Sequence, residues 1–278
     1  MDGERERPVT SAPAASLLRY ERAPLRPRDP LWLRIGAAPP LRIGSVEPEV
    51  AQALALASFD AGWCIHAFSR PDATLATLAQ TLRERGLLGA WRDELLPVHA
   101  ESGGAQLGEP VGRIERAAVR ALGIATRAVH LHGVSPQVQG PHGVWVQLRS
   151  LNKANDPGLW DTLMGGMVSA ADTLEQALAR ETWEEAGLRL DALRDLAHAG
   201  VLEIRKPSDS PSGVGYTVER IDWYRCTVPT EVLPVNQDGE VERFELVSPE
   251  RVRADVRSGR YTLEAALILA PDLVQPRA

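Results

Sequence analysis

The sequence predicts an α+β chain in which a mixed β-sheet is sandwiched by α-helices and preceded by a small α/β domain. Residues 41–124 alternate short apolar runs with helical stretches, strand-like alternation dominates after residue 125, and residues 173–186 have strong helical periodicity. We therefore divide the chain into a Pro- and Arg-rich, partly disordered segment over 1–40, an accessory α+β domain over 41–124 and a larger domain over 125–278.

The accessory domain is expected to begin near Leu41, after a segment unsuited to regular structure. Residues 1–40 contain seven prolines, which cannot propagate a helix or a central strand, and we expect the first dozen residues to be disordered. The expected strands cover 41–44, 63–68 and 91–98, and the expected helices cover 48–58, 72–87 and 114–122. Gly and Pro residues within 100–112 favour an exposed loop or hairpin.

The larger domain is expected to be rich in strands. The expected strands cover 128–132, 144–148, 196–204, 216–227 and 241–247, and closing helices are expected over 250–258 and 262–269. The first two strands would form a hairpin. For the helix over 173–186, Asp172 and Glu175 have the spacing of a capping box, and Gly187 is suited to a left-handed stop.

Composition excludes some classes of protein. A net charge of −6 and an isoelectric point near 5.6 argue against sequence-independent binding of nucleic acid, which needs a basic surface. No stretch approaches the roughly 18 apolar residues of a membrane span, and the N-terminus lacks the apolar run of a signal peptide. Cys64 and Cys226 show no metal-binding or disulfide spacing. We expect a cytoplasmic protein with no membrane or nucleic-acid partner.

Acidic side chains crowd one face of the helix over 173–186. Glu181, Glu184 and Glu185 fall within an arc of about 100° on that face, and Arg180 is placed to pair with Glu184. Crowded, partly buried carboxylates repel one another unless a cation intervenes, and Mg²⁺ or Mn²⁺ prefers such oxygen ligands. The backbone of Gly165–Gly166 and the helix N-terminus could approach phosphate oxygens. The glutamate pair alone would be equally consistent with a solvated helix face.

The spacing of the whole stretch resembles the Nudix box, G-x5-E-x7-R-E-U-x-E-E-x-G-U, where U is aliphatic. Gly166, Arg180, Glu181, Glu184, Glu185 and Gly187 match it, whereas Asp172 replaces its first glutamate and Thr182 an aliphatic residue. The resemblance implies a Nudix fold over 125–278 that hydrolyses an X-diphosphate linkage. It also implies Mg²⁺ or Mn²⁺ held by Glu181, Glu184, Glu185 and a carbonyl near Gly166, with Arg180 orienting the cluster.

The segments on either side of this stretch indicate a particular branch of the Nudix family. Residues 91–98, 156–166 and 238–246 resemble the Nudix branch that has an N-terminal domain of unassigned role. That branch includes the Nudix half fused to thiamine pyrophosphokinase in some yeasts, and plant and fungal stand-alone relatives. This resemblance implies hydrolysis of damaged thiamine diphosphate analogues to monophosphates.

Further catalytic and binding residues are expected around the box. The general base could be Glu184, Glu185 or a downstream carboxylate, for which we select Glu240, although Glu242 and Glu245 are equally acidic. Arg149, Lys153 and Gly165 lie just before or within the box and could meet substrate phosphate, or could be strand-end residues without that role.

Several alternatives stay open. A pyrophosphatase acting on ADP-ribose or NADH would have the same box, and a non-catalytic binding module would be expected to lose metal carboxylates that are present here. Isopentenyl diphosphate isomerisation would need a catalytic cysteine, and neither cysteine lies in such a motif. The expected partner is a small-molecule diphosphate, and a homodimer is left open.

Overall fold

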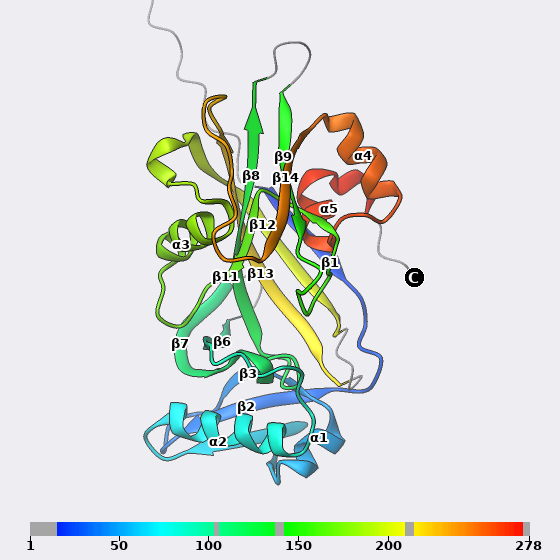
Figure 1. The fold of residues 1–278 in the computed structure, drawn as a ribbon. Helices are drawn as coiled ribbons and strands as arrows, with labels where there is room; N and C mark the ends of the chain where they lie inside the picture. Colours follow the sequence, from blue (N-terminus) through cyan, green and yellow to red (C-terminus); the bar gives the residue numbers. More distant parts are fainter. Residues whose placement is uncertain (1–15, 103–105, 137–141, 209–213, 275–278) are drawn as a thin grey trace, which may run out of the picture.

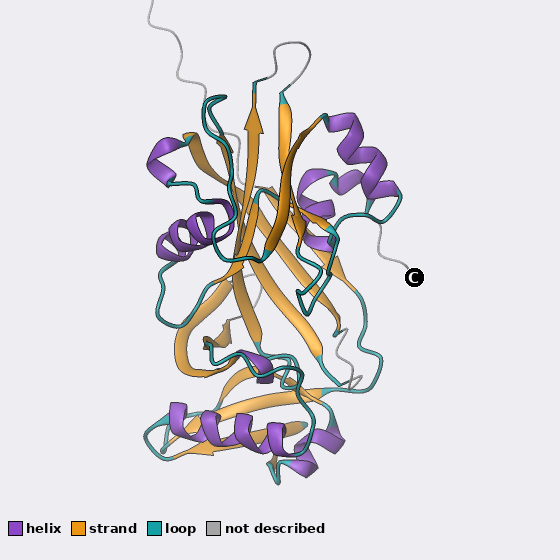
Figure 2. Cartoon of the chain, in the orientation of Figure 1, coloured by secondary structure: helices purple, strands orange, loops and turns teal. Residues whose placement is uncertain are grey.

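The computed structural model describes residues 16–102, 106–136, 142–208 and 214–274, which form two β-sheets, a separate hairpin and helices (Figures 1 and 2). The larger mixed sheet lies in the upper part of Figure 1, and the smaller sheet lies below it with its helices. The predicted α+β class is confirmed by this mixture of sheets and packed helices. The predicted boundaries at 40 and 125 stay predictions.

The smaller sheet has the strand order β3-β2-β5-β4 and is formed from residues before 68. Its strands are β2 (Asp29–Ile35), β3 (Leu41–Val46), β4 (Ala57–Phe59) and β5 (Gly62–Ala67). The helices of this region are α1 (Pro48–Ala53) and α2 (Pro71–Glu84). Leu75, Leu78 and Leu82 form the buried stripe of α2, as its spacing predicted. The hairpin of β6 (Leu95–Ser102) and β7 (Gln106–Glu115) follows, and a short 3₁₀ turn covers Arg116–Ala118.

Three predictions for this region are wrong. Regular structure begins before Leu41, because β1 (Ser16–Glu21) pairs in parallel with a strand some 180 residues away and β2 buries Leu31 and Leu33. The expected helix over 114–122 is instead the end of β7 and a 3₁₀ turn, and the helix expected over 48–58 ends at Ala53. The prediction for the first dozen residues lies outside the described residues.

The larger sheet has the order β1-β12-β13-β8-β9-β10, with β11 paired to β8 and β14 paired to β9. Its strands after β1 are β8 (Ala125–Ser135), β9 (Gly143–Arg149), β10 (Trp160–Asp161), β11 (Met164–Met167), β12 (Arg194–Pro207), β13 (Tyr216–Thr227) and β14 (Val241–Val247). β13 runs parallel to β8, whereas β9, β10, β11 and β14 join by antiparallel pairing.

Helices cover both faces of the larger sheet (Figure 1). On one face α3 (Leu174–Ala186) packs against β8 and β11, and on the other lie α4 (Pro249–Arg257) and α5 (Leu263–Leu269). Alternate residues of the strands therefore enter different cores. Val129 and Leu131 of β8 pack with α3, whereas Ala128 packs with Leu267 of α5. β11 pairs with β8 and lies against α3, so the backbone of β11 and one face of α3 meet beside the sheet.

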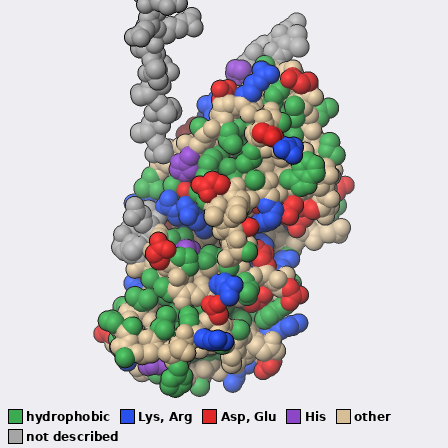
Figure 3. Space-filling model, turned by 90° about the vertical axis from the view of Figure 1, so that its left-hand side faces the viewer, with side chains coloured by type: hydrophobic (Ala, Val, Ile, Leu, Met, Phe, Trp, Pro, Cys, Tyr) green, Lys and Arg blue, Asp and Glu red, His purple; other side chains and the backbone are tan. Residues whose placement is uncertain are grey.

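Basic and acidic side chains are interspersed over the face shown in Figure 3. Within the described part of the chain, no helix has the length and apolar character required to cross a membrane. The cytoplasmic location stays a prediction.

Candidate active site

The helix α3 begins with a capping box, but not the one expected. Thr173 is the N-cap: its hydroxyl accepts a hydrogen bond from the Gln176 backbone N–H at 3.2 Å, and Gln176 Oε1 accepts from the Thr173 N–H at 2.8 Å. The predicted capping by Asp172 and Glu175 is therefore wrong by one residue. Either neighbour is a good capping residue, and Thr173 has the extended backbone of an N-cap, with φ −76° and ψ 170°. Gly187 is left-handed with φ 62°, as predicted.

Arg180 connects the start of α3 to its acidic face. Its guanidinium donates to Asp172 Oδ2 from Nε at 3.0 Å and from Nη2 at 2.8 Å. The Nη1 atom donates to Glu181 Oε1 and to Glu184 Oε2, both at 2.9 Å, so the expected pair with Glu184 is present. Nη2 also donates to the Met167 carbonyl at 3.3 Å. Asp172 thus holds the arginine that in turn holds two carboxylates.

Glu181 lies directly against the backbone of β11. A Cβ atom at Gly166 would overlap the Glu181 carboxylate, so only glycine leaves room for this side chain. Burial raises the pKa of Glu181 to about 7, in the same direction as repulsion by Glu185 and Glu184, while Arg180 opposes the shift. The carboxylate is therefore held where a second positive charge would stabilise its ionised form.

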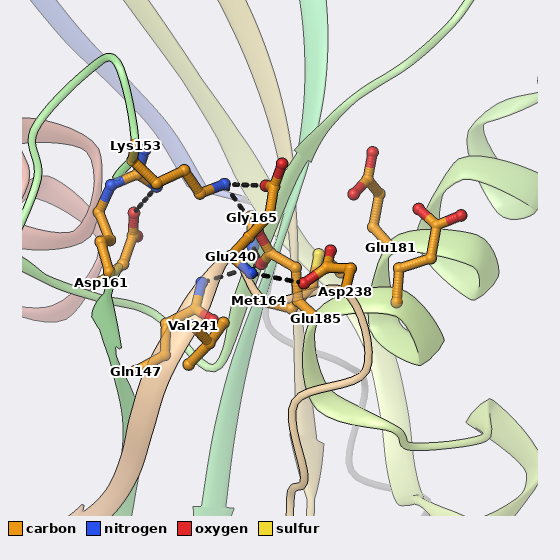
Figure 4. A network of polar contacts seen from close by, with 12 residues as sticks. Gln147, Lys153, Asp161, Met164, Gly165, Glu181, Glu185, Asp238, Glu240 and Val241 are labelled. Atoms are coloured by element: carbon orange, nitrogen blue, oxygen red, sulfur yellow. Dashed lines mark hydrogen bonds and ion pairs between the residues drawn. The ribbon is translucent and has the colours of Figure 1, made fainter. Parts of the chain in front are cut away.

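Glu185 is buried one turn further along α3, beneath the loop that follows β9 (Figure 4). Its carboxylate accepts hydrogen bonds from the Gly165 N–H at 3.0 Å and from Gln147 Nε2 at 2.9 Å. Lys153 Nζ lies 3.5 Å from its other oxygen. Burial raises the pKa of Glu185, and Lys153 and these hydrogen bonds oppose that shift.

Lys153 also makes an ion pair with Glu240, and Figure 4 shows its side chain reaching over to both carboxylates. Burial alone would raise the pKa of Glu240, but the hydrogen bond and charge of Lys153, with Arg116 and Arg149, lower it overall. Arg149 donates to Asp161 Oδ2 at 3.2 Å and to the Asn155 carbonyl at 3.0 Å. It therefore fixes the loop that carries Lys153.

The structure brings most of the predicted site residues together. Glu181, Glu184 and Arg180 form one cluster, and Glu185, Lys153, Glu240 and Gly165 form a second, with Arg149 at its edge. Sequence reasoning missed Gln147. It shares a strand face with Trp145, which packs on the α3 side of the sheet, so alternation along β9 could have placed it there.

The donor set fits a hard divalent cation. Carboxylate oxygens are the ligands that Mg²⁺ and Mn²⁺ prefer, and the missing Cβ of Gly166 creates a cradle in which Glu181 meets the backbone of β11. Arg180 and Lys153 offset only part of the negative charge, because together they pair with five carboxylates. Among the described residues, no three acidic, histidine or cysteine side chains converge closely enough to enclose an ion.

The capping arrangement predicts different effects for two neighbouring residues. Thr173→Ala removes the N-cap hydroxyl and should lower the free energy of unfolding by about 1 kcal/mol. Asp172→Asn should leave the cap intact but weaken the hold on Arg180, so catalytic turnover should fall more than stability. Urea denaturation of both variants beside a turnover assay checks this. A larger stability loss for Asp172→Asn than for Thr173→Ala would show that Asp172 is the cap after all.

Comparison with known proteins shows which family the region around this site resembles. Residues 133–267 match the family model of the NUDIX domain. Nudix hydrolase 20, chloroplastic, of Arabidopsis thaliana is 31% identical over 193 residues, covering 67% of this chain and 48% of the relative. Nudix hydrolase 24, chloroplastic, of the same plant is 28% identical over 201 residues, covering 72% and 52%.

A third relative differs in its named activity. An isopentenyl-diphosphate Delta-isomerase of Corynebacterium glutamicum is 27% identical over 178 residues, covering 60% of this chain and 88% of the relative. The chain spans about half the length of the two Arabidopsis relatives. The family match encloses β9, β11, α3 and β14, the elements that carry the carboxylate clusters. Residues 133–267 of this chain are therefore similar to the NUDIX domain family.

Proposed function

We propose that this chain is a Mg²⁺- or Mn²⁺-dependent hydrolase that cleaves the diphosphate linkage of a small-molecule X-diphosphate. The observation that carries the proposal is the placement of the α3 carboxylates against β11. Glu181 meets Gly166 and Glu185 accepts from the Gly165 N–H, with Arg180 and Lys153 offsetting part of their charge. A helix face that served only for solvation would not bury Glu185 completely beneath a lysine.

In this proposal Glu181, Glu184 and Glu185 hold the metal together with the Gly166 carbonyl. A bound Mg²⁺ would neutralise the diphosphate and polarise the phosphorus under attack by water. Arg180 positions Glu181 and Glu184 through two bonds of 2.9 Å. The Gly165 N–H holds Glu185 in its present orientation. These residues thereby preorganise the site before substrate enters.

The proton of the attacking water would pass to a carboxylate. Glu240 is ion-paired with Lys153, which lowers its pKa and makes it a weaker base than an unpaired carboxylate. We propose Glu184, the most exposed of the three α3 glutamates, or Glu185 as the general base, and Glu240 as the residue that positions Lys153. Lys153, with Arg149 fixing its loop, would then meet a phosphate oxygen of the substrate.

For the substrate we propose a damaged thiamine diphosphate analogue, converted to its monophosphate. The support is the resemblance of residues 91–98, 156–166 and 238–246 to the branch associated with that reaction. Isomerisation of isopentenyl diphosphate is disfavoured, since burial raises the pKa of Cys226 to about 12 and Cys64 is buried in the smaller sheet. ADP-ribose and NADH are the second candidates, because Nudix hydrolases share the box.

A substrate panel tests the proposal. Oxythiamine diphosphate, ADP-ribose, NADH and a dinucleoside polyphosphate are incubated with the protein and Mg²⁺ or Mn²⁺, and products are followed by ³¹P NMR. We expect metal-dependent release of phosphate from oxythiamine diphosphate at the highest kcat/KM. A preference for ADP-ribose of tenfold or more would overturn the assignment of the substrate. No turnover of any compound would favour a binding module.

A further inference from the structure

A cavity of about 210 Å³ lies beside the Lys153–Glu240 ion pair, where two distant parts of the chain meet. One wall is the loop after β9, and another is the turn at Asp238–Glu240 before β14. The third wall comes from the accessory domain, which contributes Arg92 and Arg116 from the two ends of the β6–β7 hairpin. The accessory domain therefore reaches the candidate active site with two arginines.

The described lining of this cavity has an excess of positive charge. Arg92, Arg116, Arg149 and Lys153 face it, against the two carboxylates of Asp238 and Glu240. Lys153 is paired with Glu240 within the lining. Two of the arginines pair with carboxylates outside it, Arg116 with Glu94 at 2.7 Å and Arg149 with Asp161 at 3.2 Å. The exposed side chain of Arg92 makes no ion pair with any residue that the structure describes. An arginine fork of this kind matches the geometry of phosphate oxygens.

Lys153 connects the lining of this cavity to one of the α3 carboxylates. Lys153 lines it and lies 3.5 Å from Glu185 Oε1, so an anion in the cavity would be within one side chain of the proposed metal ligands. This cavity also adjoins a second cavity of about 360 Å³, since Arg92, Arg116, Ala154 and Asn155 line both.

The second cavity has the character of a site for an organic group. Apolar side chains including Leu88, Val119, Met167 and Val214 line it, together with a few polar groups such as Tyr216 and Thr126. Its volume lies in the range of small-molecule sites, which are mostly apolar with a small number of polar groups. A molecule with an anionic end and an organic end would span both cavities.

We propose that Arg92 and Arg116 of the accessory domain bind the phosphate oxygens of the substrate diphosphate, and that its organic group occupies the adjoining cavity. The inference rests on the proposed function for the identity of the substrate. It gives the accessory domain a role in substrate binding: the domain adds two arginines to the cavity that Arg149 and Lys153 also line, and it forms one side of the organic-group cavity.

The first part of the proposal, that Arg92 and Arg116 bind phosphate oxygens, is tested without turnover by measuring the binding of inorganic pyrophosphate to metal-free protein. Isothermal titration calorimetry in EDTA at low salt compares the wild type with Arg92→Gln and Arg116→Gln. We expect each substitution to weaken binding about tenfold, because a charge-assisted contact to phosphate is lost. Arg85→Gln, an exposed arginine outside both cavities, and Glu94→Gln, which breaks the Arg116 ion pair but keeps the arginine, should bind as the wild type does.

Two results would overturn the arginine assignment. One is unchanged affinity in both arginine variants, and the other is no binding by the wild type at pyrophosphate concentrations up to about 10 mM. Neither result depends on hydrolysis. Loss of pyrophosphate binding in the arginine variants, combined with full turnover by Glu185→Gln, would instead sustain the anion site while refuting the proposed catalytic carboxylates.

The substitution Gly89→Trp tests the second part of the proposal, that the organic group of the substrate occupies the adjoining cavity. Gly89 lines the second cavity, and a Cβ atom there would meet nothing within 4 Å, so the fold tolerates a side chain. We expect the substitution to weaken binding of oxythiamine diphosphate at least tenfold while leaving pyrophosphate binding unchanged. Equal affinity of wild type and variant for oxythiamine diphosphate would exclude this cavity as the site of the organic group.

Discussion

Glu185→Gln is expected to lower kcat/KM for diphosphate hydrolysis about 10³-fold, since several kcal/mol of transition-state stabilisation would be lost with one metal ligand. The side chain is buried and accepts from Gly165 and Gln147. A glutamine has nearly the same shape but lacks the negative charge that Lys153 and a metal would share. Steady-state kinetics at saturating Mg²⁺ measure the effect.

Glu242→Gln is the matched control, because Glu242 is an exposed carboxylate on β14 that makes no hydrogen bond or ion pair with the described cluster residues. It should retain the wild-type kcat/KM. Thermal unfolding of both variants separates a catalytic loss from a folding defect. A loss of less than tenfold for Glu185→Gln, or the same loss for both variants, would contradict the role assigned to Glu185.

Gly166→Ala should lower kcat about 100-fold while the protein stays folded, because displacing a catalytic group by about 1 Å can have an effect of this size. The new methyl group would overlap the Glu181 carboxylate and drive it off β11. The carboxylate is the end of the flexible Glu181 side chain, and Arg180 holds it at 2.9 Å. Moving this side chain should therefore disturb the site more than the β-sheet. Kinetics beside a thermal melt check both parts.

Glu242→Gln again serves as the control, since Glu242 is exposed and lines neither cavity. Its kcat should equal that of the wild type. If Gly166→Ala instead kept full kcat, Glu181 would not need its position against β11, and its assignment as a metal ligand would be wrong.

The sequence predicted the elements whose signals are local. The strands over 216–227 and 241–247 have the predicted bounds, since alternation and flanking turns mark them, and the helix over 173–186 agrees within one residue. The spacing of the motif likewise predicted that Arg180 lies beside the acidic side chains with which it pairs in the structure. These features depend on residues within a few positions of one another.

Features that depend on contacts between separate parts of the chain could not be predicted from local sequence patterns. β1 forms because β12 offers it a parallel partner, and nothing within residues 16–21 signals that pairing. Asp172, the expected cap, instead accepts a hydrogen bond from Arg180, eight residues on. The contact of Lys153 with Glu185 and Glu240 requires β9, α3 and β14 to be in place together.

Metal binding tests the central claim that the α3 carboxylates hold a divalent cation. Titration of Mn²⁺ into the wild type, Glu181→Gln and Glu185→Gln, followed by electron paramagnetic resonance of free Mn²⁺, measures it without any substrate. We predict saturable Mn²⁺ binding by the wild type and at least tenfold weaker binding by either variant, because each removes one charged oxygen ligand. Equal Mn²⁺ affinity of the three proteins would contradict the claim.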